Sequence, residues 1–259
     1  MGGKTIAITV SYDGARFAGF ARQPGLDTVQ GRIETALRTV LRCDIEIVGA
    51  GRTDAGVHAL GQVVSFDVPS DHEVDTHALA RSLNALAGPD VVVREVREAD
   101  PGFSARFDAV SREYRYRIVP GPVPPLFLRD LAWWPKVPLE LRAMRRAADA
   151  LVGEHDFRSF CATESAEGKR TVRHVELVEV LPAEELGEHC VVVRVVGNAF
   201  LHSMVRVMVG TLVEVGAGRS EEGWVAEVLS ARDRVAAGPT APAHGLTLWH
   251  VDYPDEVWL

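Results

Sequence analysis

The chain has 259 residues, 47% hydrophobic and 25% charged, which is the balance of an ordinary globular protein with one large or two modest domains. No run of about 18 apolar residues occurs, so we expect no transmembrane helix. The apolar stretch in MGGKTIAITV is too short for a secretory signal peptide. Three cysteines, Cys43, Cys161 and Cys190, are scattered and include no C-x-x-C pair, which excludes a disulfide framework and a cysteine zinc site. We therefore expect a cytoplasmic protein.

The net charge is −8, which argues mildly against a nucleic-acid partner because phosphate binding is largely electrostatic. The basic residues are unevenly chosen, however, with 25 Arg and only 3 Lys. Arginine presents a planar fork to phosphates and stacks on bases, so local patches can still bind nucleic acid. Codon bias explains the same composition equally well, and charge alone decides nothing.

In the first hundred residues, segments with an apolar residue at every second position alternate with segments in which apolar residues recur every three to four positions. Asp27, followed by Gln30 three residues later, indicates a capping box at the start of the first helix. Strands are predicted from apolar alternation and helices from three-to-four-residue spacing. The expected elements are a strand at 4–12, a helix at 28–42, strands at 44–49 and 60–68, a helix at 76–86 and a strand at 91–99. This β-α-β-β-α-β order is typical of ferredoxin-like folds.

The second half repeats the theme after a strand at 111–119, on which Arg112, Tyr114 and Tyr116 share one face. Residues 119–138 hold six of the fourteen prolines, so we expect an extended connection there. Trp133 and Trp134 in it are interpreted as anchors packed on the body, with RNA stacking as the alternative. The remaining predicted elements are a helix at 139–152, strands at 171–181 and 190–197, helices at 202–216 and 221–231, and a strand at 246–253.

These patterns predict an α+β protein of two ferredoxin-like-related lobes with mostly antiparallel sheets and a cleft between them. The boundary is placed after residue 105. Residues 1–105 form the lobe that carries the loop described next, and residues 106–259 form the lobe that completes the cleft.

The stretch GAGRTDAGVHALGQVVSF, residues 49–66, places unusual chemistry in a turn between two strands. Asp54 can serve as a nucleophile, a base, a metal ligand or a turn residue that accepts from backbone N–H groups. Alternate residues of an extended segment project the same way, so Arg52 is expected beside Asp54, although it can instead contact a phosphate. A dinucleotide-binding G-x-G-x-x-G is excluded because Asp54 stands where the third glycine belongs and a strand follows.

No metal site is predicted. The segment DHEVDTH, 71–77, is rich in ligand types but lacks H-x-x-x-H and H-E-x-x-H spacing, and its acids suit the start of a helix. His58, His202 and His244 are possible site residues, although a lone histidine is more often structural. The segment EHDFRSF, 154–160, is interpreted as a helical turn with two phenylalanines in the core.

From these residues alone, an enzyme acting on a nucleic acid is compatible with the sequence but not required by it. At GAGRTDAGVHALGQVVSF the chain closely resembles the TruA family of tRNA pseudouridine synthases. The resemblance continues, in family order, through YDGARFAGF, TVQGRIETAL, FSARFDAVSREYRYRI, EHDFRSF, GNAFLHSMVRVMVGTLVEVGAG and AGPTAPAHGLTLWHVDY.

The resemblance implies a reaction and residues that perform it. Asp54 is expected to be the catalytic residue, with Arg52 pairing with it and helping to extrude the target nucleotide. Tyr114 is expected to stack on the target base, and Leu246 to line its pocket; the alternative for Tyr114 is a plain core aromatic. The implied reaction converts uridine to pseudouridine at positions 38, 39 and 40 of the tRNA anticodon stem-loop. The implied enzyme is a homodimer that binds tRNA in its central cleft, uses no cofactor and has no membrane association.

The sequence departs from the family pattern in two places and leaves several arginines open. GFARQ stands where many relatives carry a Trp-Gln pair, which puts RNA contacts of that loop in question, and NALAGPDV, 84–91, lacks the usual Leu-Pro. Each candidate phosphate contact is equally compatible with a plain surface role. The candidates are Arg16, Arg22, Arg106, Arg112, Lys169 and Arg170.

Two other functions are compatible with these residues. One is an RNA-binding chaperone that has the fold without the catalysis, which the intact Gly-Arg-Thr-Asp motif and Tyr114 disfavour. The other is a metal-dependent hydrolase that uses Asp54 and nearby histidines, which the ligand spacing disfavours.

Overall fold

The computed structural model describes residues 4–69 and 72–259, which form two compact units. The first contains the described residues up to Ser111 together with Leu248–Leu259, and the second is Arg112–Thr247. The C-terminal residues thus belong with the N-terminal ones in one compact unit, and the predicted boundary between two lobes after residue 105 stays a prediction. Within the described residues, no helix is both long enough and apolar enough to span a bilayer.

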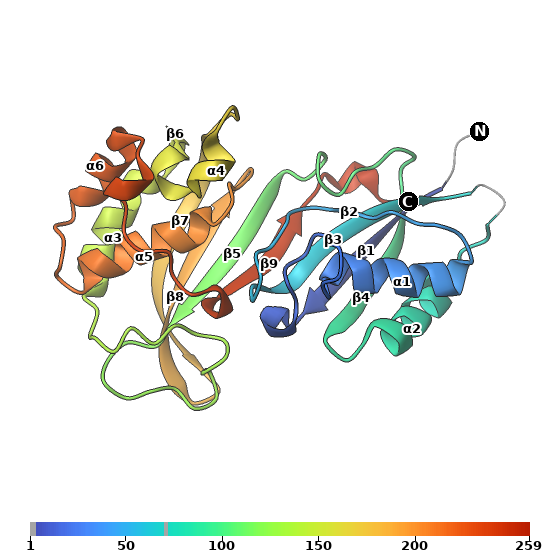
Figure 1. Cartoon of the computed structure of the whole chain (residues 1–259), viewed down its shortest axis with the longest axis horizontal. Helices are drawn as coiled ribbons and strands as arrows, with labels where there is room; N and C mark the ends of the chain where they lie inside the picture. Colours follow the sequence, from blue (N-terminus) through green and yellow to red (C-terminus); the bar gives the residue numbers. More distant parts are fainter. Residues whose placement is uncertain (1–3, 70–71) are drawn as a thin grey trace. The chain divides into compact units, whose positions relative to one another are not determined.

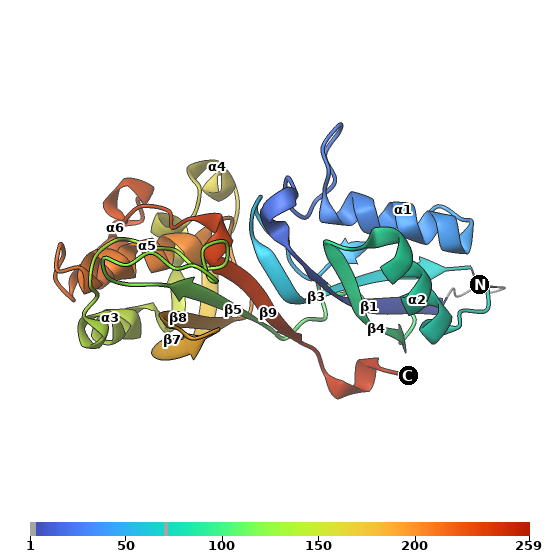
Figure 2. The ribbon, with the colours of Figure 1, turned by 90° about the horizontal axis from the view of Figure 1, so that it is seen from below.

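The first unit has the predicted β-α-β-β-α-β order. Strands β1 to β4 pair in antiparallel fashion, with β1 between β3 and β4, and β2 against β3. Helices α1 and α2 lie side by side along this sheet (Figures 1 and 2). The elements are β1 Lys4–Tyr12, α1 Val29–Leu41, β2 Val48–Gly49, β3 His58–Val68, α2 Thr76–Ala87 and β4 Val91–Ala99.

Helix α1 forms where the apolar spacing predicted it, and it buries Val29, Ile33 and Leu37 against the sheet. Its N-cap differs from the prediction. The Thr28 hydroxyl, not the Asp27 carboxylate, accepts from the Gly31 N–H at 3.3 Å. Asp27 lies one residue too early to cap and pairs instead with the guanidinium of Arg32.

The second unit is also α+β with an antiparallel sheet, in the strand order β5–β8–β7–β6. Helices α3, α5 and α6 pack together beside these strands (Figures 1 and 2). The elements are β5 Ser111–Ile118, α3 Leu141–Ala148, β6 Gly153–Asp156, α4 Thr163–Ala166, β7 Val172–Glu185, β8 Glu188–Gly197, α5 Met204–Gly216, α6 Trp224–Ala231 and β9 Leu246–Asp252. Strand β9 begins in this unit and ends in the first.

Three strand predictions needed correction. The strand expected at 44–49 is reduced to the two residues of β2, and β6 has no counterpart in the sequence prediction. Strands β7 and β8 extend beyond the predicted 171–181 and 190–197 to form a hairpin. The hairpin closes through Leu186 and Gly187, both at positive φ (53° and 77°), the backbone of a tight two-residue hairpin turn.

The connection at 119–138 contains no helix or named strand, as the prolines predicted. Trp133 is tied to the end of β5 because its N–H donates to the Arg117 carbonyl at 2.9 Å. The indole N–H of Trp134 donates to the Gly121 carbonyl at 2.9 Å. The helical turn predicted within 154–160 is present as a 3₁₀ turn at Phe157–Phe160, with both phenylalanine rings completely buried.

Candidate active site

The Gly-Arg-Thr-Asp segment lies between β2 and β3 and turns tightly after Asp54. The N–H of Val57 donates to the Asp54 carbonyl at 3.1 Å, and Gly56 has a φ of +79°. That φ is in the left-handed region that favours glycine. Asp54 is half-buried and Arg52 is exposed, whereas Thr53 between them is buried. The loop therefore anchors itself through its middle residue and presents charged side chains on either side.

The anchor is Tyr12, at the end of β1. Its hydroxyl shares a hydrogen bond of 2.8 Å with the hydroxyl of Thr53, and both side chains are buried. Burial raises the pKa of Tyr12 to about 12, and the hydrogen bond to Thr53 opposes the rise. Tyr12 is therefore neutral at physiological pH. Two residues before Thr53, the Gly51 carbonyl accepts a hydrogen bond from the Gln62 side-chain amide at 2.7 Å.

A second support comes from the segment that follows β1. The N–H of Phe20 donates to the Thr53 carbonyl at 3.0 Å, directly before Asp54. Gly19 has a φ of +104°, and a Cβ there would lie 3.1 Å from the same carbonyl oxygen. A Cβ on Gly49 would lie 2.5 Å from the Phe20 ring. Because Gly19 has no side chain, it packs closely against Thr53 of the loop, and because Gly49 has none, the Phe20 ring packs closely against the end of β2.

His58 supports the loop from its C-terminal side. The Gly14 N–H donates to His58 Nδ1 at 3.2 Å, and Asp13 lies 3.1 Å from the same nitrogen. A Cβ on Gly14 would lie 2.0 Å from the Val57 carbonyl oxygen, so the two backbones can approach only because Gly14 has no side chain. His58 is buried, and these contacts tie the start of β3 to the turn that follows β1.

Tyr114 and Leu246 belong to the second unit. Tyr114 lies on β5 opposite Val195 of β8 and is 7% exposed. Its ring meets the Phe200 ring edge-on, with centroids 5.1 Å apart and an interplanar angle of 82°. Leu246, the first residue of β9, is buried.

The segment before Leu246 is held against β5 by Tyr116. The Tyr116 hydroxyl donates to the Pro242 carbonyl at 2.7 Å, and burial raises the pKa of this phenol. A Cβ on Gly245 would lie 2.6 Å from the Tyr116 ring. The chain leading to Leu246 is therefore fixed to the same strand that carries Tyr114.

The candidate phosphate contacts differ in exposure. Arg112 is buried, and its guanidinium donates to the Asn198 carbonyl at 2.6 Å. Arg16 lies 3.9 Å from Asp90, and Arg106 lies over the Phe107 ring. The candidates with exposed side chains are Arg16, Arg22, Arg106, Lys169 and Arg170. Their contacts with RNA stay predictions.

Sequence reasoning missed the supports of the loop, namely Tyr12, Phe20 and Gln62. The available signal was a polar aromatic at the end of an otherwise apolar strand, since a buried tyrosine needs a hydrogen-bond partner. Among residues 4–69 and 72–259, no group of three or more His, Cys, Asp or Glu side chains is arranged to hold a metal ion. Asp71 of the DHEVDTH segment lies outside the described residues.

Comparison with known proteins defines the class. The sequence profile described as tRNA pseudouridine synthase matches residues 8–108 and 147–254. The chain belongs to this family.

Relatives named tRNA pseudouridine synthase A align over nearly the whole chain. The protein of Brevibacillus brevis is 46% identical over 96% of this chain and 100% of its own length. The protein of Frankia casuarinae is 47% identical over 97% of this chain and 90% of its own length. The protein of Bacillus subtilis is 42% identical over 96% of this chain and 98% of its own length. Among solved structures, a Cbf5-Nop10-Gar1 complex matches 90% of this chain and 60% of its own at 15% identity. Its TM-score of 0.35 is too low to show a shared fold.

Proposed function

We propose that this protein isomerises uridine to pseudouridine at positions 38, 39 and 40 in the anticodon stem-loop of tRNA. The observation that carries the proposal is the Gly-Arg-Thr-Asp loop, which is fastened on three sides and presents Asp54. An enzyme that uses no cofactor depends on its own side chains for the reaction, and a rigid loop that holds one carboxylate in place meets that requirement.

The reaction breaks the N1–C1′ bond, turns the uracil and forms a C5–C1′ bond. N1 gains a proton and C5 finally loses one, so nothing is oxidised and no group is transferred from outside. The chemistry therefore calls for no cofactor. Asp54 acts near the ribose, by attack on C1′, by attack on C6 or by removal of a 2′ proton, and these three routes remain open.

Arg52 and Tyr114 act on the position of the nucleotide rather than on its bonds. We assign Arg52 to pairing with Asp54 and to extruding the target from its stack, which costs a few kcal/mol. Stacking on Tyr114 returns about 1–3 kcal/mol of that cost. The edge-on contact with Phe200 supports this role because it fixes the plane of the Tyr114 ring. Leu246 lines the pocket for the detached uracil.

In this proposal the two α+β units act as lobes around an RNA-binding cleft, and the residues of both act on the same nucleotide. The protein is a cytoplasmic homodimer that binds the anticodon stem-loop. The exposed Arg16, Arg106 and Arg170 support RNA binding despite the net charge of −8, because each can pair with a phosphate through two N–H groups.

The test is release of tritium from tRNA transcripts made with C5-tritiated uridine. A transcript with uridine at positions 38–40 is compared with a matched transcript that has cytidine at those positions, each with and without EDTA. We expect release from the first only, unaffected by EDTA. Binding without release on several uridine-containing tRNAs would leave the RNA chaperone, and release abolished by EDTA would favour the metal-dependent alternative.

A further inference from the structure

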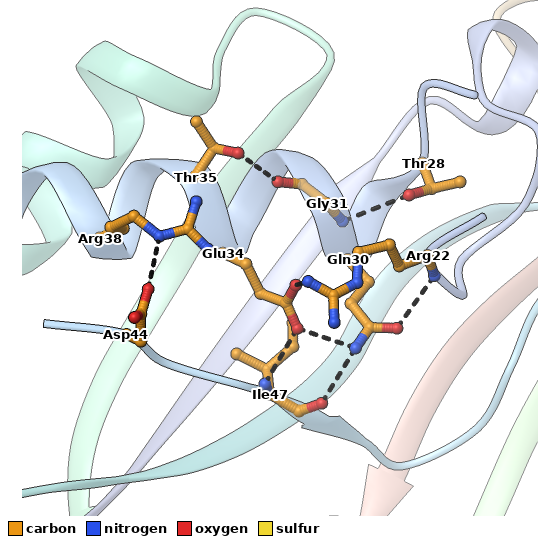
Figure 3. Close-up of polar contacts among 9 residues, drawn as sticks. All are labelled: Arg22, Thr28, Gln30, Gly31, Glu34, Thr35, Arg38, Asp44 and Ile47. Atoms are coloured by element: carbon orange, nitrogen blue, oxygen red, sulfur yellow. Dashed lines mark hydrogen bonds and ion pairs between the residues drawn. The ribbon is translucent and has the colours of Figure 1, made fainter. Parts of the chain in front are cut away.

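Helix α1 carries a buried carboxylate that the proposed reaction does not use. Glu34 is 1% exposed, whereas Arg38 of the same helix is exposed and Arg32 is partly exposed. Figure 3 shows its two oxygens turned toward different partners. Oε1 accepts from the Gln30 amide at 2.8 Å and from the Ile47 N–H at 3.2 Å, and Oε2 lies 3.2 Å from the Arg22 guanidinium.

Arg22 is attached to α1 at two points. Its side chain is 56% exposed and pairs with the Glu34 side chain, which is 2% exposed. Its backbone N–H donates to the Gln30 side-chain carbonyl at 3.0 Å, and the same Gln30 amide also donates to the Ile47 carbonyl at 3.3 Å (Figure 3). Glu34 and Gln30 thus fix both the side chain and the backbone of residue 22.

The segment held in this way is the one that supports the Asp54 loop. Two residues before Arg22, the Phe20 carbonyl accepts from the Gln30 N–H at 2.9 Å. The N–H of the same Phe20 donates to the Thr53 carbonyl at 3.0 Å. Residues 19–22 therefore lie between α1 on one side and the Gly-Arg-Thr-Asp loop on the other, and Glu34 fastens the α1 side.

A buried carboxylate is costly unless it is paired and hydrogen-bonded, and an apolar residue of similar size often stabilises a fold as well or better. Stability alone thus gives weak grounds for Glu34 at this position. Another ion pair of the same helix, Arg38 with Asp44 at 2.9 Å (Figure 3), is different because it is exposed. Its side chains are 50% and 94% exposed. It serves as a matched control.

We propose that Glu34 is a positioning residue for the isomerisation, acting through Arg22 and residues 19–22 on the loop that carries Asp54. Glu34 touches no reacting atom. This inference rests on the proposed function of that loop and adds a residue to it. It also assigns Arg22 to the loop's support rather than to a phosphate.

The variants Glu34→Gln and Arg22→Gln test the proposal. Glutamine keeps the shape of Glu34 and an acceptor for Ile47 but removes the charge facing Arg22. Displacement of a catalytic group by about 1 Å costs about 100-fold, so a partial displacement predicts a fall in kcat of tritium release between about 10- and 100-fold. The Kd for tRNA stays within about twofold of wild type, because a positioning defect appears in kcat and not in binding.

The double variant and the control complete the test. Because both residues act as one unit, the double variant is expected to lose no more than the worse single variant. Asp44→Asn removes the same charge from an exposed pair and leaves kcat unchanged. Circular dichroism verifies folding, and if Glu34→Gln does not fold, the exposed change Arg22→Gln decides.

Wild-type kcat in folded Glu34→Gln would overturn the proposal. So would Arg22→Gln with normal kcat and weakened tRNA binding, which is the behaviour of a phosphate contact. Failure of the proposed function itself is separate, because it would appear as binding of uridine-containing tRNA by the wild-type protein without release of tritium.

Discussion

The hydrogen bond between Tyr12 and Thr53 makes a quantitative prediction about the loop that carries Asp54. Tyr12→Phe removes only the phenolic oxygen, which lies 2.8 Å from the Thr53 hydroxyl in a buried environment. Loss of one partner of a buried hydrogen bond costs about 1–3 kcal/mol because the other is left without its bond. At pH 8 we expect the variant to unfold with a free energy lower than that of wild type by this amount.

The raised pKa of Tyr12 gives the same substitution a pH dependence. Above pH 10 the unfolded chain loses the phenolic proton, while the folded chain, with a pKa of about 12, keeps it. The stability that Tyr12 contributes is therefore intact below pH 10 and is lost as the pH rises toward 12. At pH 11 the loss is on the order of 1 kcal/mol, and the Tyr12→Phe variant does not show it because it has no phenol to titrate. Groups common to both proteins, such as Tyr116, cancel in the difference.

Urea denaturation of both proteins at pH 8 and pH 11, followed by circular dichroism, measures this difference. The difference in the free energy of unfolding between the two proteins should fall by about 1 kcal/mol from pH 8 to pH 11. A variant as stable as wild type at pH 8, or a gap that does not change with pH, would refute the argument that a buried, neutral Tyr12 anchors the loop.

Gly210 and Tyr114 of the second unit give two further predictions, each with a matched control substitution. In α5, Gly210→Ala places a Cβ 1.7 Å from the Pro239 carbonyl oxygen. The clash outweighs the gain of about 1 kcal/mol in helix propensity, so we expect urea denaturation to show a free energy of unfolding lower than that of wild type by about 1–3 kcal/mol. Gly223→Ala, whose Cβ would meet nothing within 4 Å, should be neutral, and equal stability of the two variants would contradict the packing argument. Tyr114→Phe keeps the stacking ring and most of kcat/KM for tritium release, whereas Tyr114→Ala loses about 1–3 kcal/mol of transition-state stabilisation. Equal losses in both would show that the ring face is not what the substrate uses.

Periodicity predicted most elements because it records burial directly. Val29, Ile33 and Leu37 recur at helical spacing, and all three are buried on α1. The same signal misled at residues 44–47. Ile45 and Ile47 alternate and are buried as a strand requires, but the Ile47 backbone bonds to Glu34 and Gln30 of α1 instead of to a strand. Alternation reports which side chains are buried and not which groups the backbone bonds.

The support of the candidate site was beyond local sequence signals. Thr53 meets Tyr12 across 41 residues of chain and Phe20 across 33, and neither spacing follows a helical or strand period. The hairpin turn at Leu186 was missed because a leucine at positive φ is uncommon, so the usual Asn-Gly signal is absent. The motif itself, by contrast, was visible because two glycines, an arginine and an aspartate interrupt an apolar pattern.

The most direct test of the account compares wild type, Asp54→Asn and Asp44→Asn in tritium release from one uridine-containing tRNA transcript, with tRNA binding measured for all three. The account predicts release by wild type and Asp44→Asn, none by Asp54→Asn, and equal tRNA affinity throughout. Release by folded Asp54→Asn at the wild-type rate would contradict it, because the carboxylate that the loop is built to hold would then take no part in the reaction.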